Sequence, residues 1–164
     1  MSRKRRSYET GHKPKFLVVV DDTPECDRAI YFASRRCARI GGQVIMCRVI
    51  ATKDRKQQWL GGADIMQQEA QEEARTVLAQ AAARARSIAG ISAETVIREG
   101  EVSAEILKLI EEDDDIALLI LAAGTGKEGP GPLVDALSKS AGTYPIPVAI
   151  VPGQLADDDL DAMT

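Results

Sequence analysis

The chain has 164 residues, a length typical of one domain, and its 45% hydrophobic and 28% charged residues are typical of a water-soluble globular protein. A formal net charge of -4 disfavours nucleic-acid binding, and no apolar run approaches the ~18 residues that a membrane-spanning helix needs. The single histidine, His12, lies in a basic N-terminal segment, so a Ser-His-Asp triad in the body of the chain is excluded.

Residues 1–14 are polar and basic, and no apolar signal segment follows their charged start. The first fifteen residues carry six Lys and Arg residues against one Glu. We therefore expect a disordered basic tail over 1–14. The three cysteines lack CxxC spacing, which indicates reduced thiols, small core residues and a cytoplasmic protein.

Apolar runs and helix-compatible segments alternate along the rest of the chain. The run "KFLVVVDD" predicts a first strand, and Thr23 and Pro24 are typical of the first turn of a helix, which Gly41 would end. Further strands are predicted at 43–50, 92–99, 116–123 and 147–151, and further helices at 63–89, 101–115 and from Pro132 to about Gly142. The inward stripe of the 63–89 helix is predicted to begin at Ile65.

Two segments lie outside this alternation. Trp59 falls in a polar connection, where we expect it to pack against a helix end. Residues 154–164 contain four Asp and no periodic apolar face, so we expect a mobile acidic tail. The domain would then span 15–153, with both tails dispensable for folding.

The order of these elements predicts an α/β fold, a five-stranded parallel doubly wound sheet with helices on both faces. Ligands of such sheets bind beyond the carboxyl ends of the strands, where the strand order switches. The chain segments at these ends are Asp21-Asp22, 48–51 and 123–131.

The stretch "GTGKEGPGP" (124–132) follows the fourth predicted strand and contains G-x-G-x-x-G as Gly124, Gly126 and Gly129. A dinucleotide fingerprint follows the first strand instead, and Walker-loop spacing is not met because Lys127 precedes the second glycine of any match. Two interpretations stay open. The loop is a wide turn that needs glycine φ angles, or its N–H groups and Lys127 bind an anion beside a helix N-terminus.

The carboxylates after the first strand also have two interpretations. Asp21 lies where a side chain can bind an amine, a ribose hydroxyl or a metal, whereas Asp22 or Thr23 is expected to cap the following helix. Arg48, at the end of the second strand, is expected to form an inter-strand ion pair that neutralises Asp21, or to contact a ligand.

Three stretches together resemble the universal stress protein family: "FLVVVDDTPECDRAIYFASRRCARIGGQVIMCRVI", "REGEVSAEILKLIEEDDDIALLILAAG" and "YPIPVAIVPG". The resemblance covers roughly residues 15–152 and implies a Rossmann-like fold of the adenine-nucleotide α-hydrolase type. Arg48-Val49 occupies the family's pair at the end of the second strand. The resemblance also implies a homodimer through the last strand, with Val148, Ala149, Ile150 and Val151 at the interface.

The nucleotide-binding branch of that family carries G-x-x-G, nine residues and G-[ST] after the fourth strand, and this sequence departs from it. Counted from Gly124, the second glycine is replaced by Lys127 and the final pair by Leu137-Ser138; counted back from Pro147, the pair is Val134-Asp135. We therefore expect a non-catalytic regulatory or adaptor protein that binds ATP weakly or not at all and acts on an unknown protein partner.

Two alternatives remain. One is a protein that binds ATP or AMP, with Mg²⁺, and hydrolyses slowly or not at all. Its nucleotide would contact Asp21, Val49, Gly124, Gly126, Lys127 and Gly129. The other is an enzyme of the wider α-hydrolase group, for which the sequence offers no recognisable catalytic set. No cofactor, membrane or nucleic acid is otherwise expected.

Overall fold

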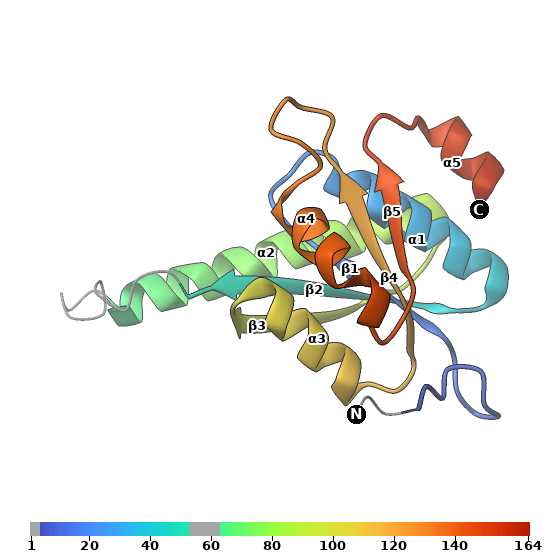
Figure 1. Ribbon diagram of the computed structural model, residues 1–164, viewed down its shortest axis with the longest axis horizontal. Helices are drawn as coiled ribbons and strands as arrows, with labels where there is room; N and C mark the ends of the chain where they lie inside the picture. The colour runs from blue at the N-terminus through green and yellow to red at the C-terminus, as the bar shows by residue number, and fades with distance from the viewer. Residues whose placement is uncertain (1–3, 53–62) are drawn as a thin grey trace.

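The computed structural model describes residues 4–52 and 63–164. Its centre is one parallel sheet in the order β3-β2-β1-β4-β5 (Figure 1). The strands are β1 (Lys15–Val19), β2 (Gln43–Ala51), β3 (Glu94–Gly100), β4 (Ile116–Ala123) and β5 (Val148–Pro152). The predicted five-stranded doubly wound fold is confirmed. Trp59 lies outside the described residues.

Helices cover both faces of the sheet, as the right-handed crossovers of a parallel sheet require. They are α1 (Cys26–Ile40), α2 (Ala63–Ala89), α3 (Val102–Glu112), α4 (Pro132–Ser140) and α5 (Asp157–Met163). Alternate residues of β1 face opposite sides: Phe16 and Val18 pack with α1 and α2, while Leu17 and Val19 pack with α3 and α4. The two cores fix the sheet between its helices. No helix in the described part of the chain is both long and apolar enough to cross a membrane.

The start of α1 differs from the prediction. The helix begins at Cys26 after Glu25, two residues later than the Thr23-Pro24 signal indicated. Thr23 instead donates its N–H to Asp21 Oδ1 at 3.0 Å, because a short Asp side chain readily closes a turn with the residue two positions on. The predicted end is confirmed, since Gly41 adopts a left-handed φ of 72°.

The inward stripe of α2 begins later than predicted. Ile65 is 63% exposed, whereas Ala74, Leu78 and Ile88 are buried against the sheet. Figure 1 shows why: the first turns of α2 extend past the end of β2. Periodicity identified the helix, but not how much of its length a partner would cover.

The C-terminal segment forms a docked helix, so the expectation of a mobile acidic tail was wrong. Leu160 of α5 is fully buried in the core cluster that contains α1. The neighbouring aspartates meet arginines of α1, including Arg28 at 2.8 Å from Asp157. One apolar residue and a few ion pairs are enough to order this helix, although its composition resembles that of a disordered segment.

The described part of the N-terminal segment, residues 4–14, also packs on the body. Arg5 Nη1 donates to the carbonyl oxygens of Ile110 and Asp113 at 2.7 and 3.0 Å. These carbonyls lie at the C-terminal end of α3. The last carbonyl groups of a helix have no intrahelical hydrogen-bond donors, and this end carries the negative end of the helix dipole. A basic segment is therefore held at a position that sequence composition cannot identify.

Candidate functional site

The strand order places a crevice at the carboxyl ends of β1 and β4. Strand β1 pairs with β2 on one side and β4 on the other, so the connections on its two sides leave in opposite directions. Two adjoining hollows of about 310 and 430 Å³ lie there. Both are lined by Val19, Asp21, Pro132 and Leu133. This is the position that the sheet topology predicted for a ligand.

Asp21 and Val49, two of the six residues expected at a nucleotide, line the smaller hollow together with Arg48. Arg48 forms the predicted ion pair, but with Asp22: the two side chains are 2.9 Å apart. Asp22 therefore pairs with Arg48 rather than capping α1. Because its charge is matched by a carboxylate, Arg48 offers a phosphate less attraction than an unpaired arginine would.

The other four expected residues lie in the loop after β4, and the loop closes on itself. Gly124 donates its N–H to Pro130 O at 3.0 Å, and Gly129 donates to Gly126 O at 3.2 Å. Two N–H groups that an anion would need are thus used within the loop. Gly129 and Gly131 have φ values of 90° and 121°, which only glycine adopts without strain.

The loop residues nearest the cavity are not those expected from the motif. Of residues 124–131, only Pro130 and Gly131 line the hollows, and the Lys127 side chain is exposed. Helix α4 begins at Pro132 as predicted, with proline in its first turn. The four loop residues expected at a nucleotide line neither hollow, which favours the interpretation of the glycine stretch as a wide turn.

Glu25 is the site residue that the sequence analysis missed. It precedes α1 and lines the larger hollow. Its Oε1 would lie 2.9 Å from a Cβ added to Gly124, and its own Cβ lies 3.1 Å from one added to Gly153. A carboxylate therefore lies directly against the glycine loop. Glu25 lies in the turn that follows the first strand, and this turn faces the crevice. Its position in the sequence is therefore the signal that could have identified Glu25 as a site residue.

The charge of the larger hollow is negative. Asp21, Asp22 and Glu25 line it, and none of its lining residues in the described chain is Lys or Arg. Glu101, at the smaller hollow, accepts from Ser103 and Ala104 N–H and so caps α3. The crevice thus combines apolar walls with carboxylates, a combination that disfavours a multiply charged anion.

The cysteines do not contribute a nucleophile. Burial raises the pKa of the Cys26 thiol to about 11 and that of Cys37 and Cys47 to about 12. At neutral pH these thiols stay protonated, and the thiolate is the reactive form. All three are buried, as expected of small core residues. The residues that the structure describes contain no group of three or more His, Cys, Asp and Glu side chains arranged to hold a metal ion.

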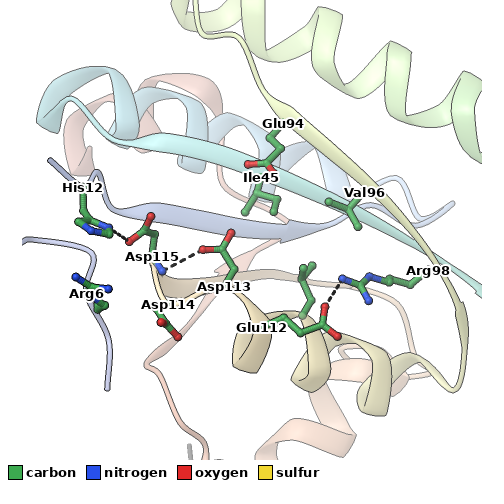
Figure 2. A pocket seen from close by; sticks show the side chains of 11 residues that line it. Arg6, His12, Ile45, Glu94, Val96, Arg98, Glu112, Asp113, Asp114 and Asp115 are labelled. Atoms are coloured by element: carbon green, nitrogen blue, oxygen red, sulfur yellow. Dashed lines mark hydrogen bonds and ion pairs between the residues drawn. The ribbon is translucent and has the colours of Figure 1, made fainter. Parts of the chain in front are cut away.

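A separate hollow of about 390 Å³ lies near the amino ends of the strands (Figure 2). His12 Nδ1 is 2.7 Å from Asp115 Oδ1, and Arg98 is 2.6 Å from Glu112. Lys15, at the start of β1, likewise meets Asp113 at 2.7 Å. These carboxylates have basic partners, and the pair of His12 with Asp115 joins the N-terminal segment to the body.

Comparisons with known proteins bear on the identity of the chain. The family model described as "Universal stress protein family" matches residues 14–152. A search of curated protein sequences found no match.

Several solved structures share the fold. The universal stress protein UspA of Lactobacillus plantarum has a TM-score of 0.70 at 15% identity, covering 84% of this chain and 97% of its own. A universal stress protein in complex with cAMP has a TM-score of 0.60 at 16% identity, covering 86% and 98%. The universal stress protein of Archaeoglobus fulgidus in complex with dAMP has a TM-score of 0.55 at 18% identity, covering 84% and 96%. Because the family model spans most of the sequence, this chain belongs to the universal stress protein family.

Proposed function

We propose that the chain is a non-catalytic regulatory member of its family whose crevice binds ATP weakly or not at all. The observation that carries this proposal is the Glu25 carboxylate against Gly124, in the loop where a phosphate would be held. A regulatory role means that the chain acts on a protein partner, and a cytoplasmic location is consistent with its reduced cysteines.

The electrostatic cost explains why Glu25 matters. Two unit charges ~4 Å apart interact by about 4 kcal/mol at the effective dielectric constant of a protein surface, and less where solvent and salt screen them. A triphosphate would meet this repulsion, and among the described residues none on the wall of the larger hollow is Lys or Arg. A Mg²⁺ ion bound with the nucleotide would reduce the repulsion.

A nucleotide with a single phosphate is the second candidate ligand. Two similar structures are named as complexes with cAMP and dAMP, and each carries one phosphate. The apolar side chains of Val49, Val102 and Leu133 line the smaller hollow and offer a base an apolar surface, with the Asp21 carboxylate beside them as an acceptor for a hydroxyl or an amine hydrogen. The base of such a ligand would occupy the smaller hollow, and its single phosphate would be repelled less by Glu25 than a triphosphate.

Titration calorimetry with ATP, AMP and cAMP, each with and without Mg²⁺, tests these proposals. We expect no ATP affinity tighter than ~10 μM, which corresponds to about -7 kcal/mol. Glu25→Gln should tighten ATP binding about tenfold, and Glu72→Gln, an exposed residue of α2, should leave it unchanged. Tight binding of ATP to the unaltered chain, or equal effects of the two substitutions, would contradict the proposal.

We further propose a homodimer through β5. Among the described strands β5 pairs only with β4, and its Ile150 side chain is 46% exposed. An apolar edge strand with open N–H and C=O groups favours association with another strand. An antiparallel copy related by two-fold symmetry would pair these groups and bury Val148, Ala149, Ile150 and Val151 at the interface.

A further inference from the structure

Helix α5 is held on the body by charges and one apolar side chain. It has seven residues, and Leu160 is the one that is fully buried. A helix of this length is not stable alone in water, so α5 is helical because it is docked. In Figure 1 it lies beside α1, at the end of the molecule where the chain leaves β5.

The surface that receives α5 is built from arginines around one aromatic ring. Arg28, Tyr31 and Arg35 lie at positions i, i+3 and i+7 of α1 and therefore share a face, and Arg84 reaches the same ring from α2. The three guanidinium carbons lie 5.3, 5.5 and 5.8 Å from the centre of the Tyr31 ring. These are cation–π distances. We call these four residues the arginine–tyrosine surface.

Helix α5 meets this surface with carboxylates one turn apart. Asp157 Oδ1 lies 2.8 Å from Arg28 Nη2. Asp161 Oδ1 accepts a hydrogen bond from the Tyr31 hydroxyl at 2.7 Å and lies 3.1 Å from Arg35 Nε. The buried Leu160 lies between these two aspartates in sequence. The surface thus contacts the sequence pattern D-x-x-L-D, which spans one helical turn of α5.

We propose that the arginine–tyrosine surface is a docking site for an acidic helical segment of a partner protein, and that α5 is the resident occupant which this segment displaces. Displacement is feasible because the ion pairs face solvent: the Asp157 and Asp161 side chains are 56% and 40% exposed. Pairs of this kind are weak and are screened by salt. The proposal concerns a second surface and holds whatever the crevice binds.

A protein segment fits this surface better than a nucleic acid does. The position of Leu160 is an enclosed apolar socket, and the Tyr31 hydroxyl donates to a single carboxylate oxygen. A phosphate backbone could pair with the arginines, but it has no side chain for the socket. The neighbouring Asp27, which hydrogen-bonds Arg84 at 2.8 Å, also disfavours a continuous polyanion.

The test uses the full chain and a labelled synthetic peptide of residues 155–164, "LADDDLDAMT", as the partner probe. Asp161→Asn weakens the resident helix, and Asp158→Asn makes the same charge change at an exposed position of α5. The peptide can bind only those molecules in which α5 has left the arginine–tyrosine surface, so its apparent affinity is proportional to the fraction of such molecules. Asp161→Asn should raise this fraction and bind the peptide at least about fivefold tighter than the unaltered chain. Asp158→Asn should not. Adding Arg35→Gln to Asp161→Asn should abolish this gain.

Three results would overturn the proposal: equal peptide affinity of both aspartate variants, no binding to Asp161→Asn, or tighter binding of a short single-stranded DNA than of the peptide. The last would assign the surface to phosphate polyanions. If Asp161→Asn fails to fold, hydrogen exchange of the unaltered chain decides. Amides of α5 should exchange about tenfold faster in ~1 M than in ~0.05 M NaCl while those of α1 do not, because salt screens exposed pairs. Equal exchange at both salt concentrations would also overturn it.

Discussion

The substitution Leu160→Ala measures how firmly the C-terminal helix is attached to the fold. Leu160 has no exposed surface, and replacing a fully buried leucine by alanine typically costs 2–5 kcal/mol. The loss here is bounded, because α5 is terminal and can undock without unfolding the sheet. The substitution can then remove no more stability than docking provides. Burial of one leucine contributes ~2–3 kcal/mol and each exposed ion pair at most ~1, before the cost of ordering the helix.

We therefore expect Leu160→Ala to lower the free energy of unfolding by about 2 kcal/mol, which for a domain of this length is a fall in Tm of about 5 °C. Urea denaturation followed by circular dichroism gives the first quantity, and scanning calorimetry gives the second. The matched control is Met163→Ala on the same helix, which is 57% exposed and should change stability by less than ~0.5 kcal/mol. Equal stability of the two variants would refute the reasoning and show that α5 does not dock in solution.

Three further predictions concern charge, backbone packing and assembly. A hydrogen bond from Arg84 holds the pKa of Asp27 below its ordinary 3.8. The ionised Asp27 therefore stabilises the fold above pH 3.8, and this stabilisation is lost as the pH falls through the lowered pKa. Asp27→Asn should make the free energy of unfolding depend less on pH in this range, measured by acid denaturation. Gly153→Ala would place a Cβ 2.5 Å from a carbonyl oxygen of β4 and should destabilise by about 1–3 kcal/mol, whereas Gly142→Ala, with open space, should not; urea midpoints decide. Ile150→Pro should convert the proposed dimer to monomer in sedimentation at micromolar concentration, and a monomeric unaltered chain would contradict that interface.

The choice of position in β5 follows from the parallel register. Leu119 donates to Pro147 O and pairs with Val148, so the N–H of Ala149 points toward β4. The N–H of Ile150 therefore points away from the sheet. A proline at Ile150 removes an outward donor and leaves the internal ladder intact, whereas a proline at Ala149 would damage the sheet itself.

Local patterns were sufficient to predict the sheet and its helices. Val18 and Val19 lie in a short β-branched run, Gly41 ends α1 with a left-handed φ, and Pro132 begins α4. These signals depend on neighbours in the sequence, and the order of strands and helices then restricts the topology. The early start predicted for α1 failed because Thr23 donates both its N–H and its hydroxyl to Asp21 in a turn, instead of capping a helix.

The ends of the chain could not be predicted in this way, because their partners lie far away in sequence. Asp161 is ordered by Tyr31 and Arg35, more than a hundred residues earlier, and Arg5 by the end of α3. Composition reports how polar a segment is, but not whether the body of the protein carries the opposite charge at the right place. Charge complementarity between distant segments has no local period to detect.

The crevice shows the same division between local and non-local information. Topology placed Asp21 and Val49 at the cavity from sequence, since Asp21 follows β1 and Val49 lies in the last residues of β2, and a parallel sheet brings these ends together. The glycine loop carried the stronger motif, yet the N–H groups of Gly124 and Gly129 are used within the loop and the carboxylate of Glu25 lies against Gly124. A phosphate loop needs both open N–H groups and a neighbourhood without uncompensated negative charge. The spacing of glycines reports only on the backbone, and Glu25, on which the proposed weak ATP binding rests, is a residue that no glycine motif contains.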